Sequence, residues 1–568
     1  MKQQHEGITA LKHGSITPSP ALPLPATSLV VASSFTPGAT GTNQPVTPGA
    51  IRAWQGSCIQ TYFDVFYFNY HITPRVVDAG VITSDKSVAV SIWSAWPDSH
   101  TLDHFEYDGD SGTSVALAVP KIFKGLESVD TQYLLSANGP ARLDCVVKAV
   151  FDNGQGLGKV EGLRAVLWPF RPNWAKPVDE TIDANTVVFM SERGYEQRRS
   201  VWANPRRSVT FRVDTWEDMS DSLWRILDNY HDVSIAAADY VRWCNLAAPA
   251  SAGDSEVTIH DPGAARRYWL TVGGYVVFRK PGEGPLQLAA VTAIDTASAA
   301  PNIVVSLDTP LAYDLSEGDY MHRCAIGYMP VSVAAGAYTY DVATVQFTLA
   351  ETPGVQPAPP LISWAESFDG SPLFLRKFNW KRPPRISFRS FRRDIDLGAG
   401  RLGRYTPVPF SSRVLTAVWD EVTKEDVFEI ERFFEARRGR AEAFWAPFFV
   451  RSVTPMSGLQ AGQSILKVEG RDFYDAYRNS PVHPAIAVRV HGGPLVLRRV
   501  DSMSLVTDAT GTNTAVVIQG TWDSDVPKDQ IDGVEWLTKA RFASDNLAVR
   551  WLTSEVATMT ISMAQVRE

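Results

Sequence analysis

The most regular pattern along the chain is a series of short apolar runs separated by polar turns. Between residues 62 and 170 these runs include 87–93, 113–119 and 142–151, and the breaks between them are rich in Gly, Asp and Asn. Runs of this length that contain β-branched and aromatic residues are typical of strands. We therefore expect a mainly β protein, with an antiparallel β-sandwich or barrel over residues 51–167.

Two later stretches, 220–230 and 424–434, have helical periodicity instead. In the second, apolar residues recur at i, i+3, i+6 and i+7 from Val427 onward, which gives one apolar face. Its acidic residues, Glu431 among them, fall largely off that face and favour the N-terminal half. A basic pair followed by Gly439 marks the end of this helix.

The chain also repeats itself. Residues 173–177, beginning Asn-Trp, recur as 379–383, and six further segments recur in the same order at an offset of roughly 205 residues. The offset drifts along the chain, as loop insertions and deletions would make it. We infer an internal duplication, with a first copy over 168–355 and a second copy over 356–568. Each copy is expected to hold strands, one amphipathic helix and then more strands.

Residues 1–50 have a different texture, being rich in Pro, Ser, Thr, Gly and Ala. They show no helical period, and their prolines oppose regular secondary structure. We expect an extended arm that is either disordered or lies along a neighbouring subunit and becomes ordered on assembly.

Composition narrows the class of protein. The chain has 568 residues, of which 45% are hydrophobic and 20% charged, as in globular proteins. Its net charge of −8 argues against a surface given over wholly to nucleic acid or membrane. No apolar run approaches the roughly 18 residues of a membrane span, so none is expected.

Cysteine usage gives no sign of a metal or redox site. The four cysteines are Cys58, Cys145, Cys244 and Cys324, and none lies within four residues of another. Zinc knuckles and redox pairs need closer spacing. We expect buried free thiols in a protein made in a reducing compartment.

Three motifs could suggest catalysis or cofactor binding, and each has a simpler interpretation. Residues 109–112, Gly-Asp-Ser-Gly, resemble a serine-protease nucleophile loop but lack its following glycine, and a hairpin turn explains them. Residues 398–403 fit G-x-G-x-x-G, but Pro407 prevents the helix that a dinucleotide needs. His100 and His104 have zinc spacing only on a helix, whereas their segment reads as a strand. We therefore assign no catalytic, cofactor-binding or metal-binding residue and expect no enzyme.

A basic stretch between residues 376 and 404 is the remaining functional signal. Its ten Lys and Arg residues interleave with aromatic residues such as Trp380 and Phe388. Such a stretch could bind single-stranded nucleic acid, form a solvated face, or pair with another subunit. The third interpretation is favoured because the equivalent stretch of the first copy, 178–200, is acidic. The candidate interface residues are Arg382, Arg385, Arg389, Arg392, Arg393, Arg437, Arg438 and Trp445.

Residues 433–445, Phe-Phe-Glu-Ala-Arg-Arg-Gly-Arg-Ala-Glu-Ala-Phe-Trp, resemble the F-F-x-A-R-R-G-R segment of distal tail proteins from long-tailed bacteriophages. Residues 168–174 and 191–199 are similar to tail-tip proteins of transposable, flexible-tailed phages. The first copy departs from the pattern, with His231-Asp232-Val233 after its helix.

This resemblance implies a structural subunit of the virion, made in the bacterial cytoplasm and placed in the tail tip or baseplate. It would form a ring or hub that connects the tail tube to the tip. Expected partners are other copies of the chain, the tube, the tape measure and receptor-binding or fibre proteins, with transient proximity to DNA in the tail lumen. Three chains with two modules each would give a pseudo-sixfold ring. The alternatives are a carbohydrate-binding adsorption protein of the virion and, third, a wall hydrolase with a carboxylate pair in a cleft.

Overall fold

The protein is seen here in a computed structural model. It describes residues 66–567, except 83–84, 110–111, 137–141, 165, 230–232, 281–285, 298–300, 358–365, 397, 399, 401, 409 and 510. The arm expected over residues 1–50 lies outside the described residues. What is described is mainly β, as expected, with large antiparallel sheets and few helices.

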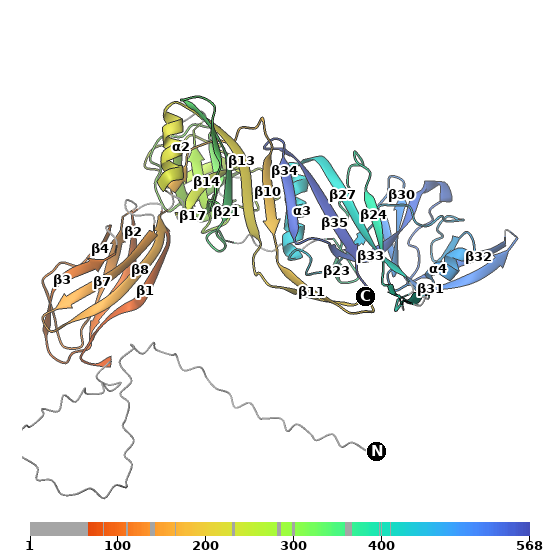
Figure 1. Ribbon diagram of the computed structural model, residues 1–568, viewed down its shortest axis with the longest axis horizontal. Helices are drawn as coiled ribbons and strands as arrows, with labels where there is room; N and C mark the ends of the chain where they lie inside the picture. The colour runs from red at the N-terminus through yellow and green to blue at the C-terminus, as the bar shows by residue number, and fades with distance from the viewer. Residues whose placement is uncertain are drawn as a thin grey trace, which may run out of the picture. The chain divides into compact units, whose positions relative to one another are not determined.

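The N-terminal β domain is one eight-stranded sheet (Figure 1). Its strands are β1 (Tyr70–Ile82), β2 (Lys86–Ser94), β3 (His100–Asp108), β4 (Thr113–Val115), β5 (Lys121–Phe123), β6 (Ser128–Leu135), β7 (Arg142–Phe151) and β8 (Gly154–Arg164). They lie in the order β4-β6-β2-β1-β8-β7-β3-β5, and all neighbours are antiparallel except β1 and β8. Alternate side chains, among them Ile92, Leu102 and Val147, face one buried cluster.

The first copy begins after β9 (Val166–Trp168). Its elements are β10 (Val178–Asp183), β11 (Thr186–Met190), β12 (Glu196–Ser200), β13 (Arg206–Trp216), α2 (Asp218–Asn229), β14 (Ile235–Asn245), β15 (Glu256–His260), β16 (Tyr275–Arg279), β17 (Leu286–Asp295), β18 (Asn302–Leu307), β19 (Tyr320–Tyr328), β20 (Ala335–Ala337) and β21 (Val342–Glu351).

The second copy begins with two short strands, β22 (Ser367–Phe368) and β23 (Ser371–Pro372). Its further elements are β24 (Arg385–Ser390), β25 (Arg393–Asp396), β26 (Leu402–Tyr405), β27 (Ser411–Thr423), α3 (Lys424–Ala436), β28 (Phe444–Pro447), β29 (Ile465–Val468), α4 (Asp472–Tyr477), β30 (Ala485–Val490), β31 (Leu495–Asp508), β32 (Gly511–Ile518), the 3-10 helix η1 (Lys528–Gln530), β33 (Ile531–Phe542), β34 (Asn546–Trp551) and β35 (Val556–Gln565).

The two copies have the same strand pairings in the same order. In each, the long strand before the helix pairs with the last strand, as β13 with β21 and β27 with β35. The strand after the helix pairs with β19 or β33, and the strands between form corresponding hairpins. The hairpin β11–β12 likewise matches β25–β26. The repetition read from the sequence is therefore a repetition of strand connectivity, and α2 and α3 fall where the helical periodicity predicted helices.

One hydrophobic cluster runs through both copies. Phe211 and Phe347 of the first copy belong to the same buried cluster as Trp419, Phe433 and Phe444 of the second. A shared core means that neither copy is complete without the other in the part of the chain that is described. The outer strands β29–β33 of the second copy pack around a smaller cluster of their own.

Candidate functional site: the junction of the two copies and the basic edge

The described residues of the three catalytic or cofactor motifs lie in strands and turns. His100 and His104 are on strand β3, and His100 Nδ1 is 2.9 Å from Asp152 Oδ1. Gly398 and Gly400 have positive φ and lie between β25 and β26, so they belong to a hairpin turn. Residues 110–111 lie outside the described residues. Among the described residues, no group of three or more His, Cys, Asp and Glu could hold a metal ion.

The first notable site is the strand pair that joins the copies. Strand β10 pairs with β13 on one edge and with β34 of the second copy on the other, both antiparallel (Figure 1). Asp179 lies opposite Arg550, and Asp183 lies opposite Asn546, whose amide donates a 2.6 Å hydrogen bond to Asp183 Oδ1. The sheet of the first copy thus continues into the second.

Behind this strand pair lies a buried ionic cluster centred on Arg242 of β14. Its Nη2 is 2.9 Å from Glu180 Oε1 and 2.8 Å from both carboxylate oxygens of Glu431 on α3. Its Nη1 is 2.9 Å from Asp239 Oδ2. The Tyr268 hydroxyl donates to Glu431 at 2.5 Å. All these groups are at least nine-tenths buried, so the ion pairs act in a poorly solvated region where removing a partner is expensive.

Two more arginines extend the cluster. Arg207 of β13 lies 3.1 Å from Glu180 Oε1 and contacts both Glu431 and Glu435 of α3. Arg323 of β19 makes a two-pronged pair with Glu351 at 2.6 and 2.7 Å. A planar guanidinium that binds a carboxylate through two nitrogens fixes orientation as well as charge. The cluster therefore sets how the second copy's helix sits against the first copy's strands.

Five carboxyl groups share these three arginines, and their pKa values diverge. Burial opposes charge on Glu431, but attraction from Arg207 and Arg242 outweighs it and lowers the pKa of that carboxyl. For Glu180 and Glu435 burial prevails and the pKa is raised. The raised pKa values follow from burial and from the like charges that the five carboxyl groups place close together.

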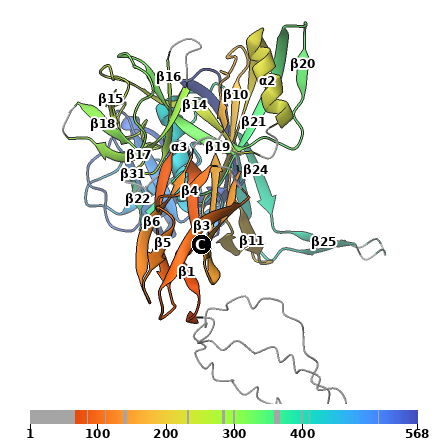
Figure 2. The same cartoon turned by 90° about the vertical axis from the view of Figure 1, so that its left-hand side faces the viewer.

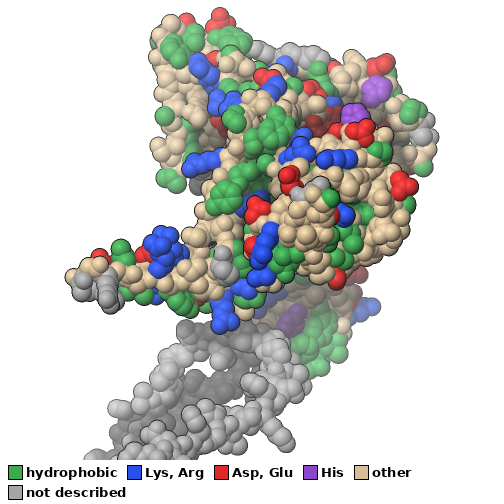
Figure 3. Space-filling model, turned by 90° about the vertical axis from the view of Figure 1, so that its right-hand side faces the viewer, with side chains coloured by type: hydrophobic (Ala, Val, Ile, Leu, Met, Phe, Trp, Pro, Cys, Tyr) green, Lys and Arg blue, Asp and Glu red, His purple; other side chains and the backbone are tan. Residues whose placement is uncertain are grey.

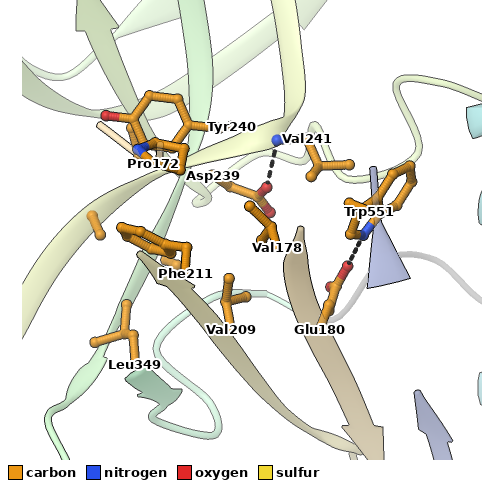
Figure 4. A pocket seen from close by; sticks show the side chains of 13 residues that line it. Pro172, Val178, Glu180, Val209, Phe211, Asp239, Tyr240, Val241, Leu349 and Trp551 are labelled. Carbon is orange, nitrogen blue, oxygen red and sulfur yellow. Dashed lines mark hydrogen bonds between the residues drawn. The ribbon is translucent and has the colours of Figure 1, made fainter. Parts of the chain in front are cut away.

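A small pocket adjoins the cluster, and Figure 4 shows its lining. Val209, Phe211 and Leu349 form its apolar wall, while Glu180 and Trp551 face each other on the opposite side (Figure 4). The Trp551 indole donates to Glu180 Oε2 at 3.0 Å, and the Asp239 carboxylate accepts from the Val241 backbone. These polar groups are already bonded to protein, so the arrangement serves packing between the copies.

The hairpin β11–β12 adds a second contact between the copies. Glu196 accepts two hydrogen bonds from Arg541, at 2.7 and 2.9 Å, and both side chains are 11% exposed. Asp545 accepts from the Thr186 backbone and hydroxyl, each at 2.9 Å, and from Arg440 Nε at 2.8 Å. The hairpin of the first copy is thereby fastened to the second.

Gly439 shows how closely the two copies approach. It has φ +65°, and a Cβ at this position would lie 2.6 Å from the Ala184 Cβ and 2.7 Å from Asp545 Oδ1. A positive φ and contact at this distance both favour glycine. The helix α3 ends at Ala436, and the Gly439 N–H donates back to Phe434 O at 3.1 Å.

The second notable site is the basic edge, which we define as β24 and the hairpin β25–β26. β24 pairs with β27, and no other pairing of β24 is described. Arg385 and Arg389 on β24 are exposed, as are Arg392 and Arg393 beside it. Arg392 lies 2.8 Å from Asp394. The β25–β26 hairpin extends away from the sheet (Figure 2). Figure 3, which views the molecule from the opposite side, shows Lys and Arg side chains on this projecting hairpin.

The other candidate interface residues lie elsewhere. Arg382 is exposed and lies 3.3 Å from Asp420. Arg437 caps α3 and pairs with Glu442 at 2.9 Å, whereas Arg438 is exposed. Trp445 is fully buried among core residues, with the Lys539 ammonium 4.6 Å from its ring. Its side chain therefore belongs to the core and is not on a surface open to another chain.

The acidic stretch of the first copy already has partners inside the chain. Asp179, Glu180 and Asp183 contact β34, and Glu196 contacts Arg541. Glu180 is thus buried and Glu196 largely covered by partners within the chain, whereas the Asp179 side chain is 56% exposed. Sequence reasoning missed Arg207, Arg242 and Glu431 as junction residues, because isolated charges in a strand or helix look like solvent-facing positions. No family model matches this chain, and no curated protein matches it either.

Proposed function

We propose that this protein is a non-enzymatic structural component of a bacteriophage tail tip or baseplate, where it forms a ring or hub between the tail tube and the tip. The observation that carries the proposal is the junction itself. Two copies of one β module are joined edge to edge by β10 and β34, and the joining residues are buried and ion-paired. A head-to-tail arrangement of like modules is the geometry from which rings are built.

The position of the phage-like segment supports this proposal. Residues 433–445 run from the end of α3 into β28. Within them, Glu435 contacts Arg207, Gly439 approaches Ala184, and Arg440 donates to the Thr186 carbonyl at 2.8 Å. The segment that resembles distal tail proteins is thus a segment through which the second copy contacts the first. A role in module-to-module assembly explains why a structural protein would carry it.

Purified virions of the source phage provide the test. We expect the protein in the particle, located at the tail end by cryo-electron microscopy, with three chains and six related β modules in one ring. Partners expected nearby are the tube, the tape measure and the receptor-binding or fibre proteins. Absence of the chain from virions would overturn the proposal. A monodisperse ring of six chains would retain the location but contradict the threefold arrangement.

A second candidate is a carbohydrate-binding adsorption protein of the virion. It is favoured by Tyr338 and Tyr340, which are 67% and 101% exposed in the turn between β20 and β21. Exposed aromatic rings on β turns can stack on sugars. Binding of host-surface glycan by the full chain, abolished in Tyr338→Ala and Tyr340→Ala, together with a peripheral position in the virion, would establish this function in place of the first.

A further inference from the structure

The strands that form the internal junction, β10 and β34, each have a counterpart in the other copy. These counterparts, β24 and β20, each have one edge without a described partner strand. This inference deepens the proposed function, because it identifies the partner of the basic edge as a second copy of the same chain. Strand β34 has two halves with different pairing partners. Residues 549–551 pair with β35, and residues 546–548 pair only with β10 of the other copy.

Strand β20 of the first copy is the counterpart of the first of these halves. Ala335, Gly336 and Ala337 pair with β21 in the same register in which Val549, Arg550 and Trp551 pair with β35. The counterparts of 546–548 are residues 332–334, which belong to no strand of the described chain. Among the described strand pairings, β20 pairs only with β21, so its other edge has no described partner.

Strand β24 is the counterpart of β10. Asp179 pairs with Thr210 of β13 as Arg385 pairs with Thr416 of β27, so the two strands occupy the same register. β10 has β34 on its outer edge, whereas the only described pairing of β24 is with β27, so its outer edge has no described partner. An open strand edge carries unpaired N–H and C=O groups that can add a further strand.

Side chains on the two free edges match as well. Within the chain, Ile182 lies opposite Leu547, and both are buried. Their counterparts are Phe388, which is 64% exposed, and Val333, which is half-buried. Two apolar side chains would thus meet where the internal junction also has two. Burial of a large exposed aromatic ring is a favourable term in such a contact.

The hairpins give an independent match. Glu196 of β12 binds Arg541 inside the chain. By strand register their counterparts are Leu402 of β26 and Tyr328 of β19, which are 69% and 36% exposed. Where the internal junction has the ion pair of Glu196 and Arg541, the two free edges have the apolar side chain Leu402 and the aromatic ring of Tyr328. Because both members change together, the two free surfaces are complementary to each other.

Charge and the helices agree with this assignment. α3 closes the internal junction, where Phe428 packs against Tyr268 with ring centroids 5.2 Å apart. Its counterpart on α2, Trp224, is 36% exposed. α2 carries three aspartates and one arginine, whereas the basic edge carries exposed arginines. Opposite charge on the two surfaces favours the contact and rejects edges of like sign.

We propose that β24 of one chain pairs antiparallel with residues 332–337 of a second copy, with its β25–β26 hairpin reaching across to Tyr328 of that copy. This contact repeats the β10–β34 junction between chains. It is head-to-tail, so each chain offers one basic edge and one β20 edge. Successive chains then close into a ring, in which residues 332–334 become strand.

Cross-linking of the full chain tests the contact. In a Cys58→Ser background, the double variant Tyr328→Cys with Leu402→Cys is treated with a short bismaleimide at roughly 100 µM protein. We expect covalent dimers and larger species in denaturing gels, and only monomers from either single variant. The matched pair Glu196→Cys with Arg541→Cys lies on the internal junction and is expected to cross-link within one chain. Only monomeric products from the Tyr328 and Leu402 pair would overturn the proposal.

A second variant tests the same contact without cross-linking. Phe388→Asp places a charge where apolar contact is expected and should weaken self-association about tenfold or more, measured by sedimentation. Ile122→Asp is the control, because Ile122 is 68% exposed on β5 of the N-terminal β domain and belongs to neither free edge. Equal association of the wild type and Phe388→Asp would also overturn the proposal.

The outcomes separate this contact from the proposed function. Location at the tail tip without cross-linking of the Tyr328 and Leu402 pair leaves the function standing and removes the contact. Cross-linking by a chain that is absent from virions establishes the contact and removes the function.

Discussion

Trp551 donates its indole N–H to the Glu180 carboxylate at 3.0 Å, and the two residues belong to different copies of one module. Trp551 is fully buried and Glu180 is 2% exposed, so water does not replace this bond readily. Trp551→Phe keeps the aromatic packing but leaves a buried acceptor without its donor. We expect a loss of about 1–3 kcal/mol in the free energy of unfolding. Denaturant titration measures it, with the exposed Trp380→Phe as a control that should change little.

Arg242 is expected to be the most sensitive position of the ionic cluster. Arg242→Met fills similar space but removes the cation that Glu180, Asp239 and Glu431 share, so that only Arg207 and Arg323 remain for five buried carboxyl groups, and we expect a loss of about 3–5 kcal/mol. Arg382→Met is the matched control, since Arg382 is exposed with a single ion pair and should contribute about 0–1 kcal/mol. Equal losses in the two variants would show that the cluster does not hold the copies together.

Low pH should lower the free energy of unfolding, because buried carboxylates at the junction must then be protonated. Burial opposes charge on Asp239, but Arg242 and Arg323 outweigh it and lower its pKa to about 2, and the pKa values of Glu351 and Glu431 are also lowered. The unfolded chain therefore binds more protons as pH falls from the usual carboxyl range, and stability present above that range is lost toward pH 2. We expect the melting temperature to fall steeply from about pH 4 to pH 2.

The raised pKa values of Glu180 and Glu435 act in the opposite sense. Their contribution is present at low pH and is lost as pH rises through their folded-state pKa values. Asp239→Asn should therefore flatten the acid limb of the stability profile, whereas Glu435→Gln should leave that limb in place and reduce the loss at higher pH. An unchanged acid limb in Asp239→Asn would contradict this assignment.

Gly439 can be tested against a matched glycine. Gly439→Ala and Gly462→Ala both place a side chain at positive φ, which carries a strain of about 1–2 kcal/mol. Only at Gly439 does the new methyl meet other atoms, the Ala184 Cβ and Asp545 Oδ1. We expect Gly439→Ala to lose about 1–3 kcal/mol more than Gly462→Ala in denaturant titration.

Cys145, Cys244 and Cys324 are buried free thiols in the structure, in agreement with the sequence-based expectation, whereas Cys58 lies outside the described residues. Burial raises the pKa of Cys244 to about 12 and also raises the pKa of Cys324. A thiol must be ionised and reachable to react. In a Cys58→Ser background the folded chain should give no reaction with Ellman's reagent, and unfolding should release all three thiols. Rapid reaction before unfolding would show that the core opens.

The sequence was sufficient for the repeat and for α2 and α3, because both leave local signals, but the six-residue helix α4 of the second copy was not expected. Apolar periodicity located α2 and α3, and the order of similar segments located the duplication. Strand β8 ends at Arg164, and β9 pairs with β14 of the first copy. The helical periodicity and the similar segments each depend on residues close together in the chain.

The junction could not be predicted in the same way. Glu431 lies off the apolar face of α3, as its spacing indicates, yet it is fully buried because Arg207 and Arg242 of the other copy cover it. A charge that is buried only by a distant segment has the same local pattern as a solvated one. Trp445 illustrates the converse, since an aromatic residue beside a basic segment gives no sign of whether it lies in the core or at the surface.

The pairing of β10 with β34 also constrains how the chain is made. Glu180 and Trp551 are 371 residues apart, so at roughly 5–20 residues per second the ribosome needs about 20–75 s to supply the second after the first. During that time the outer edge of β10 is open on the nascent chain. On an mRNA that carries several ribosomes, the carboxylates of Asp179 and Asp183 repel the β10 edge of a neighbouring nascent chain. Release of the finished polypeptide, rather than completion of the first module, is what closes this edge.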